Sequence, residues 1–199
     1  MYECGMPLAQ AYRFYWRTLW SCRANSSKAE ASGRTTYGKP EALIAVADIA
    51  AALRLKPTDS LLDIGCAKGL IGDELRPLVA RYVGVDYIQA FRPMVTGDAI
   101  ALPFRTASFD KVLLAGVLPC IVPEDHIAAL REMRRVVRRG GLGLVSCSPE
   151  MWQHGLVAQF TRDGLRDLAL RSGWRQATVR AIDARLPQAK SYFDLVVAA

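Results

Sequence analysis

The stretch Leu-Leu-Asp-Ile-Gly-Cys-Ala-Lys-Gly-Leu-Ile-Gly, from Leu61 to Gly72, decides the fold class of this chain. A short apolar run leads to Asp63 and breaks at Gly65, and an apolar spacing that suits a helix resumes after Gly69. The stretch therefore predicts a strand, a tight turn and the start of a helix. Glycine in such a turn permits positive φ and lets a ligand approach bare backbone, and the first N–H groups of the helix face the same space. A small polar ligand is expected here.

Two common nucleotide-binding patterns do not match this turn. The dinucleotide-binding pattern Gly-x-Gly-x-x-Gly has a second glycine two residues after the first, and Ala67 occupies that place. A phosphate-binding loop ends in Gly-Lys followed by Ser or Thr, whereas Lys68 precedes Gly69. Both patterns are therefore set aside.

The stretch resembles the first motif of class I S-adenosylmethionine-dependent methyltransferases, in which an acid stands two residues before the first glycine. Asp63, Gly65 and Gly69 match the motif, and Ala67 stands where the family more often has glycine. The resemblance implies that the cofactor is S-adenosyl-L-methionine, with S-adenosyl-L-homocysteine as product. It further implies that Asp63, Gly65, Cys66, Ala67 and Gly69 line the methionine end of that cofactor.

A second acid follows at the spacing that a nucleoside site requires. The run Arg81–Asp86 predicts a buried strand that ends in Asp86, 21 residues after Gly65. An acid about 20 residues after the first glycine is placed to accept hydrogen bonds from ribose hydroxyls. Tyr87, the next residue, is included among the predicted cofactor-binding residues. Only residues 87–96 follow before the next motif, so we expect one or two helical turns or an irregular crossover there.

The segment 97–116 carries the second large resemblance. Gly-Asp-Ala-Ile-Ala-Leu-Pro-Phe begins at Gly97, and Ser-Phe-Asp then leads into the apolar run 112–116. Small-molecule members of the family, of the methyltransferase type 11-like branch, often carry both runs before the fourth strand. The resemblance implies that Asp98, with Ala99 beside it and Gly97 before it, meets the adenine amino group, and that Ala115 and Gly116 approach the sulfur.

The second half of the chain predicts the remaining elements of one α/β domain. We expect a helix from Pro123 to Arg139 that ends at Gly140 as a glycine C-cap. The predicted fold is a Rossmann-like three-layer sandwich with a mostly parallel seven-stranded sheet whose last strand is antiparallel. The other expected elements are a strand at 142–146, a helix from Thr161 to Ser172, and strands at 177–182 and 192–198.

Residues 1–39 read as a helix and a loop that cap the methyltransferase domain of residues 40–199. Residues 7–22 place several aromatic side chains on one helical face, and residues 25–39 are rich in small polar residues. The substrate-side candidates are Tyr15, Trp16, Tyr37 and Lys39.

Composition limits the cellular setting more than the substrate. A chain of 199 residues suits one domain, and five scattered cysteines without a Cys-x-x-Cys pair favour reduced thiols. We expect a cytoplasmic protein with no signal peptide, no membrane span and no metal. The formal charge of +7 favours anionic partners, either an anionic small-molecule acceptor or nucleic acid.

The acceptor side offers few candidates. A hydroxyl or amine acceptor can use a general base, and histidine has the most suitable unperturbed pKa. His154 follows the fifth predicted strand on the cofactor side and is the candidate catalytic residue, although a structural role or a substrate contact remains open for it. His126 is expected on the surface of a charged helix. Cys120 is expected to be a buried, inert thiol.

The leading interpretation is a methyltransferase that acts on an oxygen or nitrogen of a small molecule. The sequence lacks the Asn/Asp-Pro-Pro-Tyr/Phe run of many amino-group nucleic-acid methyltransferases after the fourth strand. An RNA or protein methyltransferase that uses the arginines of residues 131–139 remains an alternative, for which a solvated helix face is the simpler explanation. A non-catalytic cofactor-binding partner subunit is a third possibility, suggested by the apolar run 117–122.

Overall fold

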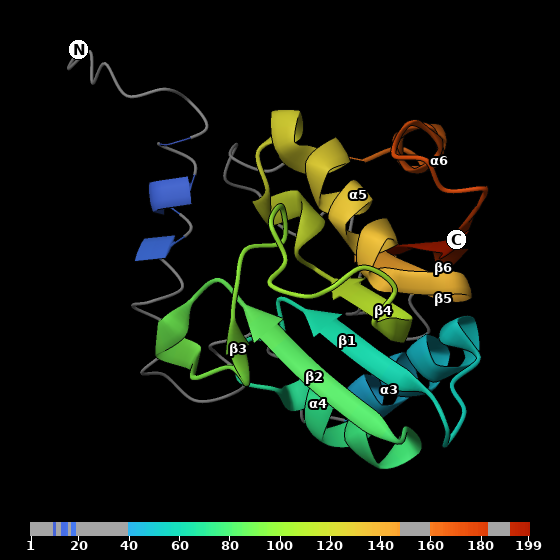
Figure 1. The fold of residues 1–199 in the computed structure, drawn as a ribbon. Helices are drawn as coiled ribbons and strands as arrows, with labels where there is room; N and C mark the ends of the chain where they lie inside the picture. The colour runs from blue at the N-terminus through green and yellow to red at the C-terminus, as the bar shows by residue number, and fades with distance from the viewer. Residues whose placement is uncertain (1–9, 11–12, 16, 19–39, 148–159, 183–191) are drawn as a thin grey trace.

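The computed structural model describes residues 10, 13–15, 17–18, 40–147, 160–182 and 192–199. These residues form a seven-stranded sheet in the order β3-β2-β1-β4-β5-β7-β6 (Figure 1). The strands are β1 (Ser60–Ile64), β2 (Arg81–Asp86), β3 (Val95–Thr96), β4 (Phe109–Ala115), β5 (Val137–Cys147), β6 (Gln176–Ile182) and β7 (Tyr192–Ala198).

The sheet is parallel except for β7. The pairs β1–β2, β1–β4, β2–β3 and β4–β5 are parallel. β7 is antiparallel to both of its neighbours, β5 and β6, and β6 forms the edge of the sheet. The predicted fold class, with the last strand antiparallel, is therefore confirmed.

Helices cover both faces of the sheet, which gives three layers (Figure 1). The helices α3 (Pro40–Leu53) and α4 (Leu70–Leu75) lie on one face, and α5 (His126–Val136) and α6 (Arg162–Arg171) lie on the other. Leu113 of β4 shares a core cluster with Leu53 of α3, whereas its neighbour Leu114 shares one with Leu130 of α5. Alternate residues of a central strand thus pack in opposite directions, which is why the central strands are apolar runs. None of the helices within the described residues is both long and apolar enough to cross a membrane.

Single 3-10 turns replace longer helices at several connections. The helix expected after the glycine turn ends at Leu75 and continues as one 3-10 turn, because Pro77 lacks the N–H that a further α-helical turn needs. The short crossover predicted after β2 is confirmed as one 3-10 turn followed by a two-residue strand. The 3-10 turns are η1 (Arg76–Leu78), η2 (Gln89–Phe91), η3 (Leu118–Cys120) and η4 (Pro123–Asp125).

The prediction that the helix beginning at Pro123 reaches Arg139 was wrong. α5 ends at Val136, and the next residue already pairs with Phe109 of β4. The pairing then shifts register, and Gly140 adopts a φ of +77° within β5. Glycine is therefore needed for a bulge in the strand and not for a helix cap.

The C-terminal elements agree with the prediction. Thr161 caps α6, since its Oγ1 accepts a hydrogen bond from the Gly164 N–H at 3.1 Å. The helix ends at Arg171 and is followed by Ser172 and a glycine with a φ of +89°. β6 and β7 lie where the two last strands were expected.

Candidate functional site

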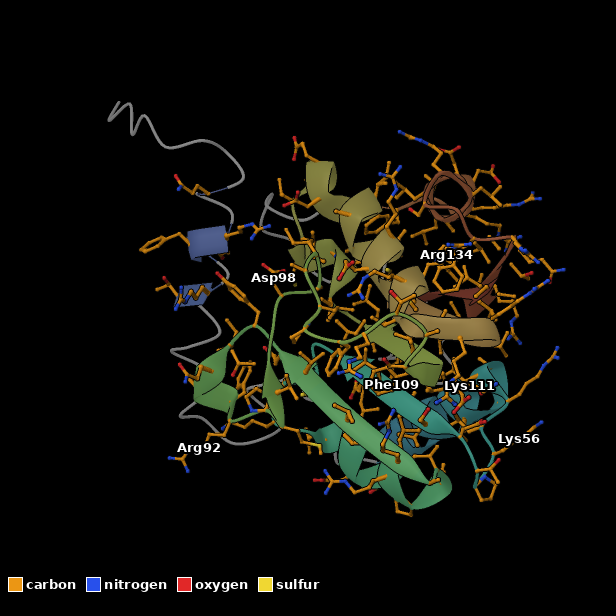
Figure 2. All side chains as sticks on the ribbon, in the orientation of Figure 1. Lys56, Arg92, Asp98, Phe109, Lys111 and Arg134 are labelled. Carbon is orange, nitrogen blue, oxygen red and sulfur yellow. The ribbon has the colours of Figure 1, made fainter. Side chains whose placement is uncertain are left out.

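The candidate site lies at the carboxyl ends of β1, β2, β3 and β4. The arrowheads of β1 and β2 point toward the same edge of the sheet (Figure 1). Figure 2 shows Asp98 beyond this edge, while Lys56 and Lys111 lie at the opposite end of the strands. Ligands of open α/β sheets bind outside the carboxyl ends of the strands, so the loops at this edge carry the predicted site residues.

Asp86 ties two of these loops together. Its Oδ2 accepts the Ala67 N–H at 2.8 Å, and its Oδ1 accepts the Ile88 N–H at 2.8 Å. The residue is 7% exposed, and burial raises the pKa of its carboxyl while the hydrogen bonds from the backbone act in the opposite direction. An ionised carboxylate has about four acceptor positions. The N–H groups of Ala67, Ile88 and Tyr87 all act on this carboxylate, so about one acceptor position is left for a further donor.

Asp63 is the most deeply buried acid of the motif. It is 3% exposed, and its Oδ2 accepts a hydrogen bond of 2.6 Å from the Tyr82 hydroxyl. Burial raises the pKa of Asp63 to about 6, against the effect of the Tyr82 hydrogen bond. Asp63 therefore titrates near neutral pH. Tyr82 was not among the predicted site residues, because its hydroxyl is the only sign of a polar role on an otherwise apolar part of the strand.

The turn after β1 is held tightly on one side and open on the other. The N–H groups of Gly65 and Cys66 both donate to the Val85 carbonyl, at 2.7 and 3.2 Å. A Cβ on Gly65 would stand 2.1 Å from a methyl carbon of Val117, and the glycine has a φ of +75°. Among the described residues, no heavy atom lies within 4 Å of the corresponding position on Gly69. The space beside Gly69 is therefore available to a ligand.

Ala67 adopts a backbone conformation that suits glycine better than alanine. Its φ is +48°, in the left-handed region that costs an L-residue roughly 1–2 kcal/mol. The Asp86 carboxylate holds this conformation by accepting the Ala67 N–H. The turn thus adopts a left-handed conformation without the glycine that suits it best.

Cys66 is half-buried and packs against β2. A Cβ on Gly84 would stand 2.8 Å from the Cys66 sulfur. Burial raises the pKa of the Cys66 thiol, and the charges of Asp63 and Asp86 add to the effect. The thiol is therefore protonated at neutral pH and is a weak nucleophile.

The loop after β3 presents a half-exposed carboxylate. Asp98 Oδ1 accepts the Ile100 N–H at 3.1 Å, and Asp98 Oδ2 accepts a hydrogen bond from Arg13 at 2.9 Å. Ala99 is 8% exposed, and its methyl group belongs to the main hydrophobic core. Gly97 donates its N–H to the Asp86 carbonyl at 3.0 Å, which joins this loop to the end of β2.

The loop after β4 is fixed to the neighbouring strand. Gly116 donates its N–H to the Ser146 carbonyl at 2.8 Å, directly after the half-buried Ala115. Cys120, in the same loop, is only half-buried, so the prediction of a buried thiol was wrong. Its sulfur donates to the Gly116 carbonyl at 3.7 Å, a weak bond that leaves the side chain partly open to solvent.

Most of the predicted acceptor-side residues fall outside the part of the chain that the structure describes. His154, Trp16, Tyr37 and Lys39 belong to this group. Tyr15 is described, lies on the N-terminal helical residues and is 38% exposed. The structure therefore brings the predicted cofactor residues together, whereas the acceptor side stays a prediction.

His126 is a structural residue, and the prediction that it lies on the surface was wrong. It is 3% exposed, and its Nε2 lies 2.8 Å from the Ile121 carbonyl. Its ring centroid stands 5.2 Å from that of Phe160. Burial lowers the pKa of His126 below its ordinary value, so the neutral ring donates to the carbonyl at neutral pH.

The arginines at the end of α5 are partly engaged within the protein. Arg135 donates to both oxygens of Glu132 and to the carbonyls of Leu102 and Phe104. Arg138 donates to Asp110 at 2.7 Å. Arg135 therefore fastens the long loop between β3 and β4 to α5, and Arg138 of β5 pairs with Asp110 of β4, so fewer of these arginines are available to nucleic acid than the sequence suggested.

Residues 62–145 match a protein-family model described as a methyltransferase domain. The demethylmenaquinone methyltransferase of Mycobacterium sp. (strain JLS) is 40% identical over 105 residues, which cover 49% of this chain and 44% of that protein. The relative from Mycolicibacterium gilvum with the same name is 34% identical over 122 residues, covering 57% of this chain and 52% of its own. The chain thus spans about half the length of the curated relatives it matches.

A solved structure shows the same fold at low identity. The 1,6-didemethyltoxoflavin-N1-methyltransferase of Burkholderia thailandensis, with bound 1,6-didemethyltoxoflavin and S-adenosylhomocysteine, superposes with a TM-score of 0.70 at 18% identity. The superposition covers 97% of this chain and 92% of that one. The resemblance read from the sequence is borne out at the level of the domain and the fold: residues 62–145 match a methyltransferase domain, and the chain shares the fold of a methyltransferase solved with S-adenosylhomocysteine.

Proposed function

We propose that this chain binds S-adenosylmethionine at the carboxyl edge of the sheet and transfers its methyl group to an oxygen or nitrogen of a small-molecule acceptor. The observation that carries the proposal is the Asp86 carboxylate. It is buried, it is oriented by the N–H groups of Ala67, Ile88 and Tyr87, and it keeps an acceptor position for a further donor. A ribose hydroxyl supplies such a donor.

In this proposal each loop at this edge contacts a different part of the cofactor. Asp86 and Tyr87 serve the ribose, while Gly97, Asp98 and Ala99 serve the adenine. The open side of the turn beside Gly69 accommodates the methionine end. The remaining proposed cofactor-binding residues are Asp63, Gly65, Cys66 and Ala67 at the methionine end and Ala115 and Gly116 near the sulfur.

The chemistry requires alignment more than activation. The methyl carbon forms a bond to the acceptor atom as its bond to the sulfonium sulfur breaks, and the sulfur keeps the electron pair of that bond. The acceptor gives up a proton during or after the transfer. Holding the methyl carbon and the acceptor atom in line, away from water, is the main contribution that a protein makes to such a displacement.

On the acceptor side we propose His154 as the residue that receives the proton from the acceptor. Tyr15, Trp16, Tyr37 and Lys39 are proposed to line the acceptor pocket. In this scheme residues 1–39 cap the methyltransferase domain of residues 40–199, and the protein works in the cytoplasm. The curated relatives are named demethylmenaquinone methyltransferases, and the Burkholderia structure contains 1,6-didemethyltoxoflavin. These names support a small organic molecule as the acceptor, and the charge of +7 favours an anionic one.

Calorimetric titration with S-adenosylhomocysteine tests the cofactor site. Asp86→Ala is expected to abolish measurable binding, because it removes the carboxylate proposed to accept the ribose hydroxyl and releases the turn. Glu74→Ala, an exposed position on α4, is the matched control and should bind like the wild type. Circular dichroism verifies that both variants fold. Unchanged affinity in folded Asp86→Ala protein would contradict the site.

Acceptors are tested by mass spectrometry of reaction mixtures with S-adenosylmethionine. Small hydroxylated or amino aromatics are the first compounds to examine, and a product that gains one CH2 identifies the acceptor. Methylation of demethylmenaquinone, which would occur at a ring carbon, would contradict transfer to oxygen or nitrogen. Incorporation into RNA with a steep salt dependence would favour the RNA alternative. Cofactor binding without turnover on any of these acceptors would favour a partner subunit.

A further inference from the structure

Arg13 joins the N-terminal helical residues to two carboxylates far along the chain. Its Nη1 donates to Asp98 Oδ2 at 2.9 Å, and its Nη2 donates to Asp125 Oδ2 at 2.8 Å. The hydrogen bond to Asp125 is the largest of the effects that raise the pKa of Arg13 above its ordinary value. A planar guanidinium with a fork of donors suits such a bridge, whereas a lysine presents a single point charge.

Arg17 makes a related contact one helical turn later. Residues 13–15 and 17–18 are helical, and residues four apart lie on the same face of a helix. The guanidinium carbon of Arg17 lies 5.7 Å from the centroid of the Tyr87 ring, within the range of a cation–π contact. The two arginines therefore reach the loops that follow β2 and β3. Figure 2 shows Asp98 on the side of the domain that faces these helical residues.

Arg13 leaves Asp98 able to accept one more donor. The carboxylate has about four acceptor positions, and the Ile100 N–H and the Arg13 guanidinium occupy two of them. The Asp98 side chain is 31% exposed, so an incoming group can reach it. An adenine amino group and Arg13 can therefore share the same carboxylate.

We propose that Arg13 is a cofactor-positioning residue, which holds the N-terminal helical residues across the nucleoside end of the site and orients Asp98 toward the adenine. The inference rests on the proposed function. The side chains of Arg13, Asp98 and Asp125 are 37%, 31% and 27% exposed. Ion pairs of this exposure are weak and are screened by salt. The bridge therefore opens to admit the cofactor, and its closure over the bound nucleoside slows the departure of the cofactor.

Asp125→Ala tests the proposal without altering the predicted adenine contact. The dissociation of S-adenosylhomocysteine from immobilised protein is measured by surface plasmon resonance. Dissociation is expected to be about twofold to fivefold faster in Asp125→Ala and in Arg13→Ala, as the loss of a partly exposed ion pair implies, with a smaller change in association. Arg13→Lys should fall between the wild type and Arg13→Ala. Glu124→Ala, the neighbouring acid of the same turn, should match the wild type.

Hydrogen exchange supplies a readout specific to the N-terminal residues. S-adenosylhomocysteine is expected to slow exchange in the peptide covering residues 13–18 of the wild type and to slow it much less in Asp125→Ala. If the wild type binds the ligand but dissociation and exchange are the same in Asp125→Ala, the positioning role of Arg13 is refuted while the cofactor site stands. If the wild type does not bind the ligand at all, both proposals fall.

Discussion

Replacing Asp63 by Asn should make the stability of the protein less sensitive to pH between 5 and 7. Burial raises the pKa of Asp63 from its ordinary value of 3.8 to about 6. The folded state then binds this proton more tightly than the unfolded chain does, so the contribution of Asp63 to stability falls as pH rises from about 4 to above 6. At about 1.4 kcal/mol per pKa unit, the full loss is roughly 3 kcal/mol. Just under half of it, about 1.3 kcal/mol, falls between pH 5 and pH 7.

Asparagine keeps the geometry of the site while it removes the titration. Its carbonyl oxygen can accept the hydrogen bond that Tyr82 now donates to Asp63 at 2.6 Å. Its amide N–H groups need acceptors of their own, which offsets part of the gain in absolute stability. The pH dependence of the difference between the two proteins is therefore the quantity that tests the argument.

The assay is urea unfolding followed by circular dichroism at a series of pH values from 5 to 8. The free energy of unfolding of Asp63→Asn minus that of the wild type should increase by about 1.3 kcal/mol between pH 5 and pH 7. Glu74→Gln is the control, because water solvates this exposed side chain before and after unfolding. Parallel wild-type and Asp63→Asn curves over this range would refute the assignment of a buried, titrating carboxyl at Asp63.

Three further substitutions test the structure at other positions. Ala67→Gly should raise the free energy of unfolding in urea by about 0.5–1 kcal/mol, since it relieves a φ of +48° at some cost in chain entropy; a loss of stability would contradict the strain. His126→Gln should reduce the loss of stability below about pH 6.5. The pKa of His126 is lowered in the folded protein, so the unfolded chain takes up this proton first as pH falls. If the free energy of unfolding in urea falls equally with pH in both proteins, the assignment is contradicted. Glu132→Ala should lower the free energy of unfolding in urea by about 1–3 kcal/mol, because Arg135 and the Leu102 N–H lose their carboxylate partner. A change below about 0.3 kcal/mol would rule out this structural role of Glu132.

The sequence predicted those parts of the fold that depend on local pattern. The strand ending at Asp86 and the helix capped by Thr161 were found at their true positions, because apolar runs, caps and glycines act over a few residues. The end of α5 was misplaced because the pairing of Val137 with β4 is a tertiary interaction, which overrides the preference of Gly140 for a helix cap. Helical periodicity also could not show that His126 faces the core.

The candidate site was predictable in its motifs and not in its long-range partners. The acids of the cofactor site stand at fixed distances from glycines along the chain, so spacing alone located them. Arg13 contacts Asp98 across 85 positions of the sequence, and no pattern in the sequence marks that pair. The Tyr82 hydroxyl was missed for a related reason, since its partner Asp63 belongs to the neighbouring strand and lies 19 positions away.

The turn after β1 concentrates features that lower stability. Ala67 adopts a left-handed conformation, Asp63 carries a carboxyl in a buried environment, and Gly65 packs against Val117 so closely that no side chain fits. A sequence selected for stability alone would place glycine at 67 and a neutral residue at 63. Several residues that lower folding stability lie in this one short segment, and a single substitution could remove each loss. Such clusters are typical of binding sites, where contact with the ligand determines which residue is present. Ala67→Gly and Asp63→Asn therefore test two different costs. Ala67→Gly should leave affinity for S-adenosylhomocysteine nearly unchanged, because the backbone path is kept. Asp63→Asn should weaken it, because it removes the carboxylate that is proposed to serve the methionine end.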